Sequence, residues 1–139
     1  YPKNPNLDQL LNPDFDLLHE VVIEEKLPIK QSEELKNSKI DGDSTVSIIS
    51  YEAEKVVIKS KNDTSALLVL TDSFYPGWKA YVDGEETKIY RADGVVRAVY
   101  VPEGEHIIEF SYFPNSLLIG SLISLVSIVC LGIIMVKKF

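Results

Sequence analysis

The chain has 139 residues, 45% hydrophobic and 25% charged, with a formal net charge of −7 and a mean hydropathy of +0.04. These averages describe an acidic domain that can bury one core, and they exclude low-complexity disorder and a basic nucleic-acid binder. The one cysteine excludes an internal disulfide framework and a zinc site built from several cysteines.

The first 18 residues contain three prolines and few apolar side chains, so we expect them to form a connector from an upstream membrane region. Residues 19–114 then carry short β-branched and aromatic runs separated by turn residues. The predicted strands are 21–25, 45–51, 55–59, 66–71, 78–82, 87–90, 95–101 and 105–113. Between the first two, residues 30–43 are polar and charged, and no element is predicted there.

The alternation of apolar and polar residues that marks a strand is clearest around Trp78, the only tryptophan in the chain. Trp78, Ala80 and Val82 share one face of a predicted strand, and Asp83-Gly84 supplies the residues of a tight hairpin after it. About eight strands at regular spacing, without a helical period long enough for a βαβ unit, predict an antiparallel β-sandwich of immunoglobulin-like or jelly-roll-like type. The fold class is therefore mainly β.

Residues 115–139 differ from the rest, because all 21 acidic residues precede Pro114. Residues 117–136 form an uncharged run of 20 in which 15 are Leu, Ile, Val, Met or Cys. A helix of this length rises ~30 Å, the thickness of the hydrocarbon core of a bilayer. A buried core helix is the competing interpretation, but core helices are usually shorter. We therefore predict a transmembrane helix with a short cytoplasmic tail.

Two lysines, Lys137 and Lys138, directly follow the apolar run. The positive-inside rule places them in the cytoplasm, so residues 1–114 are expected outside it, at the cell membrane. Translocation of that portion requires an upstream signal, and the chain begins at Tyr1. We expect the C-terminal piece of a longer membrane protein. A mature single-pass protein that has lost its signal peptide is the alternative.

Small residues recur on one face of the predicted helix, at Ser116, Gly120, Ser124 and Ser127. Such a stripe lets a neighbouring helix approach closely, which favours packing against other transmembrane helices of the same protein. The competing explanation is that Gly and Ser are common in membrane helices.

One string of residues suggests a family. Residues 73–84 read Ser-Phe-Tyr-Pro-Gly-Trp-Lys-Ala-Tyr-Val-Asp-Gly, and this segment resembles the C-terminal outer domain of the YfhO-like family of bacterial and archaeal polytopic membrane proteins. The resemblance extends over residues 12–16, 21–25, 90–92, 97–99, 101–106 and 110–114. It continues into a final transmembrane helix.

The resemblance implies a glycosyltransferase of the C-type fold that transfers sugar from a polyprenyl-phosphate donor to a cell-envelope acceptor on the outer face. In that family the catalytic carboxylate lies near the N-terminal end of the protein, in a region that this chain does not contain. The implied role here is an accessory domain without catalytic residues or cofactor; a divalent metal would belong to the catalytic region. A membrane-anchored module that binds glycan or protein is the alternative.

The candidate contacts for a glycan or lipid-linked acceptor centre on Trp78. With Tyr75, Tyr81 and Asp83 it could stack on a sugar and hydrogen-bond to it, although a core aromatic residue is the favoured interpretation. No cluster of His, Cys and carboxylate residues predicts a metal site.

The two arginines, Arg91 and Arg97, lie close to the family-like segment. They could bind a phosphate, but pairing with an acid is favoured, and the acids considered are Asp72, Asp83 and Asp93. His106 alternates with apolar residues and is predicted to be a hydrogen-bonded core histidine.

Overall fold

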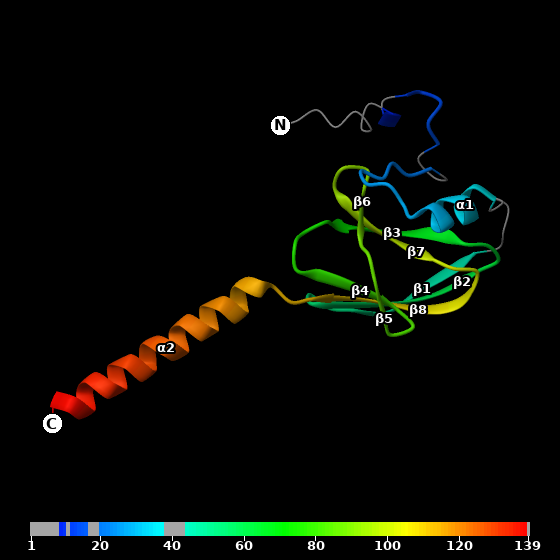
Figure 1. Cartoon of the computed structure of the whole chain (residues 1–139). Coiled ribbons are helices and arrows are strands. Elements are labelled where there is room, and N and C mark those ends of the chain that lie inside the picture. The colour runs from blue at the N-terminus through cyan, green and yellow to red at the C-terminus, as the bar shows by residue number, and fades with distance from the viewer. Residues whose placement is uncertain (1–8, 11, 17–19, 38–43, 139) are drawn as a thin grey trace.

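The computed structural model of the chain describes residues 9–10, 12–16, 20–37 and 44–138. In this part of the chain, eight strands and two helices form a sandwich with a projecting C-terminal helix (Figure 1). The elements are α1 (Ile29–Asn37), β1 (Thr45–Tyr51), β2 (Lys55–Asn62), β3 (Ala66–Ser73), β4 (Trp78–Val82), β5 (Glu85–Thr87), β6 (Tyr90–Ala92), β7 (Val96–Val101), β8 (Gly104–Tyr112) and α2 (Asn115–Lys138). Most of the predicted connector, residues 1–8, 11, 17 and 18, lies outside the described residues.

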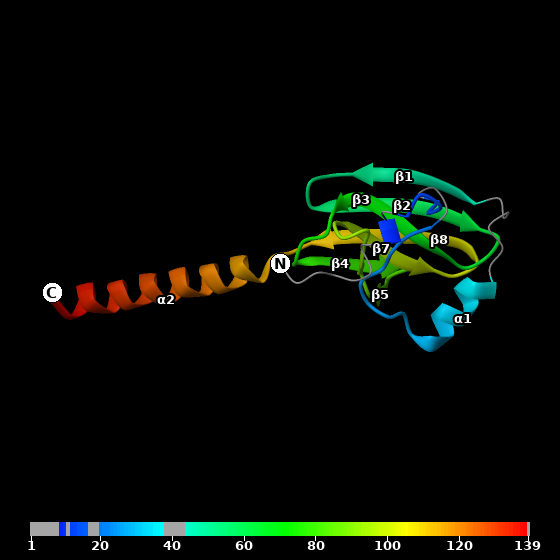
Figure 2. The ribbon, with the colours of Figure 1, turned by 90° about the horizontal axis from the view of Figure 1, so that it is seen from above.

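Two antiparallel sheets make the sandwich (Figure 2). One has the strand order β1-β2-β8-β4-β5, and the other has the order β3-β7-β6. Strand β8 pairs with β2 over residues 104–111 and with β4 over residues 108–112, so the last strand of the domain lies at the centre of the larger sheet. The predicted antiparallel β-sandwich followed by a helix of membrane-spanning length is confirmed.

The core lies between the sheets, because alternate residues of each strand turn inward. Its buried members are Val56, Ile58, Leu70, Ala80, Val99, Val101, Ile108 and Phe110. Trp78 and Val82 pack against this cluster from the same face of β4 as Ala80, as the alternation predicts. Asp83 and Gly84 both have positive φ and form the predicted hairpin turn between β4 and β5.

The strand predicted at 21–25 is wrong. Only one isolated bridge forms there, between Ile23 and Ala92, flanked by a hydrogen bond from Glu24 N to Arg91 O of 3.2 Å. Val21, Ile23 and Leu27 instead pack against a small cluster on the outer face of the three-stranded sheet. The segment is apolar because it covers that sheet as a third layer, without extending its ladder.

The sequence does not predict helix α1, because its residues are mostly polar and give a weak helical period. Two tyrosines of the three-stranded sheet hold it in place: the Tyr90 hydroxyl donates to Gln31 Oε1 at 3.2 Å, and the Tyr100 hydroxyl donates to Glu34. Contacts with distant strands, and not local pattern, therefore fix this helix.

The single strand predicted at 87–90 is also wrong. Strand β5 ends at Thr87 in the larger sheet, and β6 begins at Tyr90 in the smaller one. Lys88 and Ile89 carry the chain from one sheet to the other. An apolar run that crosses between sheets looks like one strand in sequence.

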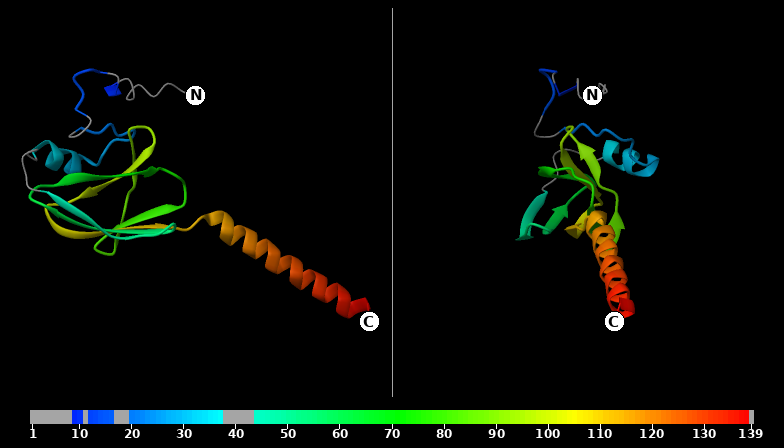
Figure 3. Two further views of the ribbon diagram at one scale, coloured as in Figure 1. Left: turned by 180° about the vertical axis from the view of Figure 1, so that it is seen from behind. Right: turned by 90° about the vertical axis from the view of Figure 1, so that its left-hand side faces the viewer.

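Helix α2 leaves one end of the sandwich, and only Phe113 and Pro114 separate it from β8 (Figure 3). Its span Ser116–Lys137 has 22 residues and a mean hydropathy of 2.7, and none of it is buried by the rest of the chain. It is thus long and apolar enough to cross a membrane. We call the end of the sandwich that adjoins α2 the membrane-side end, and the opposite end the far end.

Candidate functional site

A buried arginine lies between the sheets at the membrane-side end. Arg97 of β7 is 1% exposed, and its Nη2 donates to Asp72 Oδ2 of β3 at 2.8 Å. Its guanidinium stacks 3.9 Å from the ring centroid of Trp78 and 5.3 Å from that of Phe110. These contacts offset part of the cost of removing the charge from water.

Asp72 connects this arginine to the edge of the larger sheet, since the Tyr51 hydroxyl of β1 donates to Asp72 Oδ1 at 2.7 Å. This hydrogen bond raises the pKa of Tyr51. Burial lowers the pKa of Arg97, and Asp72 opposes that shift. In the described part of the chain, Arg97 Nε and Nη1 have no hydrogen-bond partner. We call Tyr51, Asp72 and Arg97 the Arg97 cluster; Arg97 is its buried member, and Tyr51 is 59% exposed.

Aromatic side chains extend the cluster toward α2. Trp78 and Tyr112 are cross-strand partners with ring centroids 5.2 Å apart, and the Tyr75 ring centroid lies 6.4 Å from that of Tyr112. Tyr75 is 62% exposed. The aromatic group therefore runs from the buried arginine to the surface beside α2.

Four of the six predicted contact residues lie at the membrane-side end: Tyr75, Trp78, Arg91 and Arg97. The Arg97–Asp72 pair confirms the pairing interpretation for that arginine. Arg91 stacks on Phe74 at 5.6 Å and pairs with Glu24 at 3.6 Å, an acid that was not among those considered.

The other two predicted residues lie elsewhere. Tyr81 is on the opposite face of β4 from Trp78, with Glu86 and Glu109 as its cross-strand partners. Asp83 occupies the turn at the far end. The six residues therefore do not converge on one surface.

At the far end, Asp83 binds the β8 strand through both carboxylate oxygens. His106 Nδ1 lies 2.6 Å from Asp83 Oδ2, and the Ile107 amide donates to Asp83 Oδ1 at 2.8 Å. His106 Nε2 lies 3.2 Å from the Glu103 carbonyl. The bond to Asp83 raises the pKa of His106, while the Ile107 amide and then His106 lower the pKa of Asp83. The hydrogen bonds predicted for His106 are confirmed, but its predicted place in the core is wrong: its side chain is 17% exposed and belongs to neither core cluster, because it lies beside the surface turn of Asp83.

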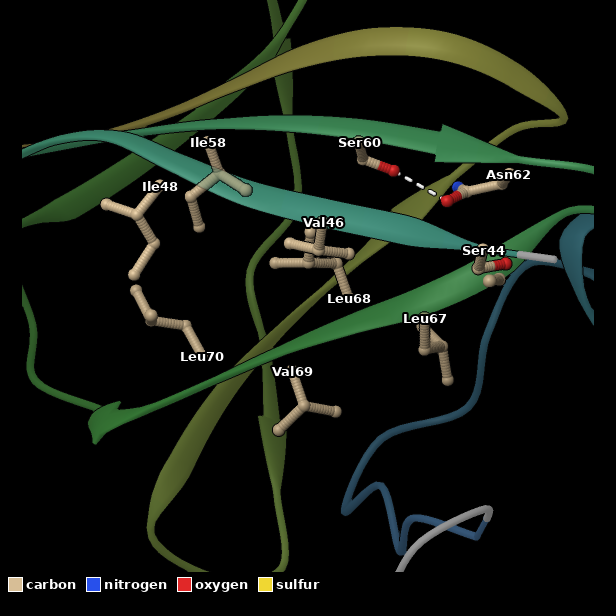
Figure 4. Close-up of a pocket in the computed structure, with 11 residues that line it drawn as sticks. Ser44, Val46, Ile48, Ile58, Ser60, Asn62, Leu67, Leu68, Val69 and Leu70 are labelled. Atoms are coloured by element: carbon tan, nitrogen blue, oxygen red, sulfur yellow. Dashed lines mark hydrogen bonds between the residues drawn. The ribbon is translucent and has the colours of Figure 1, made fainter.

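An apolar cleft of about 340 Å³ opens along one side of the sandwich, between the edge strands β1 and β3. Figure 4 shows Val46 and Ile48 of β1 facing Leu68 and Leu70 of β3. Val46 and Ile48 remain more than half exposed, because β1 extends beyond the smaller sheet. Such a lining suits an aliphatic group and offers few donors to a sugar.

No group of three or more His, Cys, Asp and Glu side chains in the described ranges is placed to hold a metal ion. On α2, the predicted packing face of Ser116, Gly120, Ser124 and Ser127 is exposed. The Ser127 hydroxyl donates to the Ile123 carbonyl at 2.8 Å, so this hydroxyl is satisfied within the helix.

Sequence reasoning does not identify Tyr51 and Tyr112 as members of this region. The one available signal is an arginine inside the apolar run of residues 95–101, which requires a buried partner. That signal predicts an acid near Arg97, but not the strand that supplies a tyrosine to the acid.

Comparison with known proteins assigns the chain to a family. Residues 32–124 match the family model described as bacterial membrane protein YfhO. The match covers most of α1, the whole sandwich and the beginning of α2. No curated protein and no solved structure matches the chain.

Proposed function

Because this chain belongs to the YfhO family of bacterial membrane proteins, we propose that it is the outer-face accessory domain and last transmembrane helix of a polytopic glycosyltransferase. That enzyme transfers sugar from a polyprenyl-phosphate donor to a cell-envelope acceptor. The catalytic residues lie in another part of the protein. In this proposal residues 1–114 are extracytoplasmic, and Lys137 and Lys138 are cytoplasmic.

The observation that carries the proposal is the direct attachment of the sandwich to α2. The Phe113 amide donates to the Gly77 carbonyl at 2.9 Å, and the Tyr112 amide donates to the Glu54 carbonyl at 2.8 Å. Two turns of the sandwich are thus bonded to the last residues before the helix. A domain held in this way stays at the membrane surface, where a lipid-linked donor would be used.

The contacts of the predicted site residues support an accessory role. Arg97 is engaged by Asp72 and Trp78, and Asp83 is engaged by His106 and the Ile107 amide. These groups stabilise the sandwich and its hairpin. The helix face with Ser116 and Gly120 is exposed and suits packing against other helices of the same protein.

The test uses the full-length protein in membrane vesicles supplied with a radiolabelled polyprenyl-phosphate sugar. Sugar transfer to the acceptor is expected, and it should fall when residues 20–112 are replaced by a Gly/Ser linker that keeps α2. A matched control replaces exposed Lys79 with Gln and should leave transfer unchanged. Absence of transfer from any lipid-linked sugar overturns the proposal. Equal transfer with and without the sandwich overturns its accessory role.

Orientation is tested in the same vesicles with Asp63→Cys in a Cys130→Ser background. Labelling of the cysteine introduced at position 63 by a membrane-impermeant maleimide from the outer side is expected. Labelling only after the inner side is exposed would invert the topology. If the protein transfers no sugar but the 139-residue chain binds glycan, and Trp78→Ala abolishes that binding without unfolding, the alternative binding module replaces the enzyme.

A further inference from the structure

Apolar side chains occupy the tips of the connections at the membrane-side end. Tyr75 in the β3–β4 loop is 62% exposed, Val95 in the β6–β7 turn is 61% exposed, and Phe113 before α2 is 54% exposed. None of the three belongs to a strand. Exposed apolar residues grouped on one end of a domain indicate a contact surface.

The three positions are fixed relative to the point where the chain enters the bilayer. The Phe113 amide is bonded to the Gly77 carbonyl, and the Phe74 amide donates to the Val95 carbonyl at 2.7 Å. Gly77 also packs closely on the junction, since a Cβ built on it would lie 3.3 Å from Pro114 Cα. The apolar span begins two residues after Pro114, at Ser116.

We propose that Tyr75, Val95 and Phe113 form a membrane-docking surface that lies in the headgroup region of the bilayer crossed by α2. The surface is continuous with the transmembrane helix, and we take the bilayer that this helix crosses as its partner. Tyrosine is favoured at this depth, because its ring can contact apolar chains while its hydroxyl stays hydrated. The sandwich then rests on the bilayer along these connections.

The charges at this end specify the kind of lipid surface. Glu52 and Glu54 in the β1–β2 turn are exposed and would be repelled by anionic headgroups. The nearby Lys55 and Lys79 pair with Glu109 at 2.8 Å and Glu86 at 3.1 Å. The docking is therefore aromatic and apolar, and its partner is a zwitterionic phospholipid surface. The Glu54 carbonyl accepts from the Tyr112 amide, so this turn adjoins the junction and its carboxylates would face the headgroups.

The test uses the 139-residue chain in phosphatidylcholine nanodiscs, with the native cysteine removed by Cys130→Ser. Single cysteines are introduced as Tyr75→Cys, Val95→Cys and Phe113→Cys, each labelled with an environment-sensitive fluorophore. Far-end controls are Asp63→Cys and Glu103→Cys. Lipids with a nitroxide on the headgroup are expected to quench most of the emission at positions 75, 95 and 113. They should leave positions 63 and 103 unchanged.

Quenching at 75 and 95 no stronger than at 63 and 103 overturns the proposal. Quenching that appears only when anionic lipid is added, or that disappears in high salt, also overturns it, because it would show electrostatic attachment. Unchanged Trp78 emission confirms that each variant is folded. The site tested does not depend on sugar transfer, so failure here leaves the proposed function intact.

A second measurement tests the consequence for the domain. The double variant Tyr75→Ser, Val95→Ser should lower the anisotropy of a fluorophore at position 63, because the sandwich then moves more freely above the bilayer. The matched control is Ile107→Ser, which removes an exposed apolar side chain from β8. Equal anisotropy in the double variant and the control would contradict the docking surface.

Discussion

The two ends of the sandwich accommodate polar groups in opposite ways. At the membrane-side end the guanidinium of Arg97 is covered by the rings of Trp78 and Phe110, and three of the connections carry the exposed apolar residues Tyr75, Val95 and Phe113. At the far end Asp83 and His106 satisfy each other at the surface, and the turns are polar. One fold thus has exposed apolar residues at the end beside α2 and polar residues at the opposite end.

The difference also shows how stability is distributed. The Arg97 cluster joins β1, β3 and β7, so it connects the two sheets beside α2. The Asp83–His106 contact only fastens a hairpin turn to its neighbouring strand. We therefore expect substitutions at the membrane-side end to lower the free energy of unfolding more than matched substitutions at the far end.

The largest effect is expected for Arg97→Ala. Loss of this side chain leaves Asp72 without its ion partner and removes the stacking contacts to Trp78 and Phe110, at a cost of about 3 kcal/mol in the free energy of unfolding. This loss is measured by unfolding the protein with urea in detergent and monitoring the fluorescence of Trp78.

The matched control is the double variant Arg97→Met, Asp72→Asn, which replaces the ion pair with neutral groups of similar size. It should recover most of the stability, because no charge is then left without a partner. If both variants unfold at the same urea concentration, loss of packing and not of the charge pair explains the effect.

The second comparison uses one glycine from each end. Gly77 has a φ of 108°, and a Cβ there would lie 3.0 Å from the Tyr112 ring, so Gly77→Ala should cost about 3 kcal/mol. Gly84 in the far turn has a φ of 87° with nothing within 4 Å, so Gly84→Ala should cost about 1 kcal/mol. Similar unfolding midpoints for the two variants would contradict this interpretation of the Gly77 contact.

The Asp83–His106 pair at the far end makes the stability of the sandwich depend on pH. The pKa of His106 is raised above 6.5 in the folded chain, so its stabilising contribution is complete below pH 6.5 and is lost as pH rises through the raised value. The pKa of Asp83 is lowered below 3.8, so its contribution is present above that value and is lost as pH falls through the lowered one. The pair stabilises the hairpin between these limits.

Asp83→Asn should remove this pH dependence at a cost below about 1 kcal/mol near pH 6, because asparagine keeps the left-handed backbone and loses a charge that solvent partly screens. Unfolding midpoints measured from about pH 5 to pH 8, the range in which a histidine titrates, provide the check. A wild-type midpoint that does not fall as the pH rises above the His106 pKa would contradict the assignment.

The smallest effect is expected for Glu105→Gln. Glu105 lies 3.4 Å from Lys59 and 3.5 Å from Lys61, and the hydrogen bond and charge of Lys59 are the main reasons that its pKa is lowered. All three side chains are about half exposed, and solvent screens such pairs. The unfolding midpoint should stay unchanged within error, and a clear shift would show that the far end depends on charge more than its exposure indicates.

The sequence pattern predicts those parts of the fold that depend on contacts between residues close together in the chain. The alternation around Ala80, the hairpin at Asp83-Gly84 and the apolar span of α2 can all be predicted, because each depends on neighbouring residues or on length alone. Helix α1 cannot be predicted in this way, since distant tyrosines hold it. The prediction of a strand at 21–25 is wrong for a related reason. A segment that covers the outer face of a sheet needs apolar residues just as a strand within the sheet does, so the two have similar sequences.

The candidate site shows the same limit. The sequence indicates that Arg97 needs a partner, and Asp72 is among the candidates. The contribution of Tyr51 depends on how β1 lies over β3, which is a property of the sheet order. Proximity in sequence groups Tyr81 and Asp83 with Trp78, but a strand turns neighbours to opposite faces and a turn redirects them.

Because only two residues join β8 to α2, the orientation of the sandwich depends on the thickness of the bilayer. The span Ser116–Lys137 is 22 residues long, so it measures about 33 Å and slightly exceeds a hydrocarbon layer of about 30 Å. A helix that is too long for its bilayer tilts. Because no flexible linker intervenes, the far end of the sandwich would swing through the same angle, and a thinner membrane would carry it closer to the lipid surface.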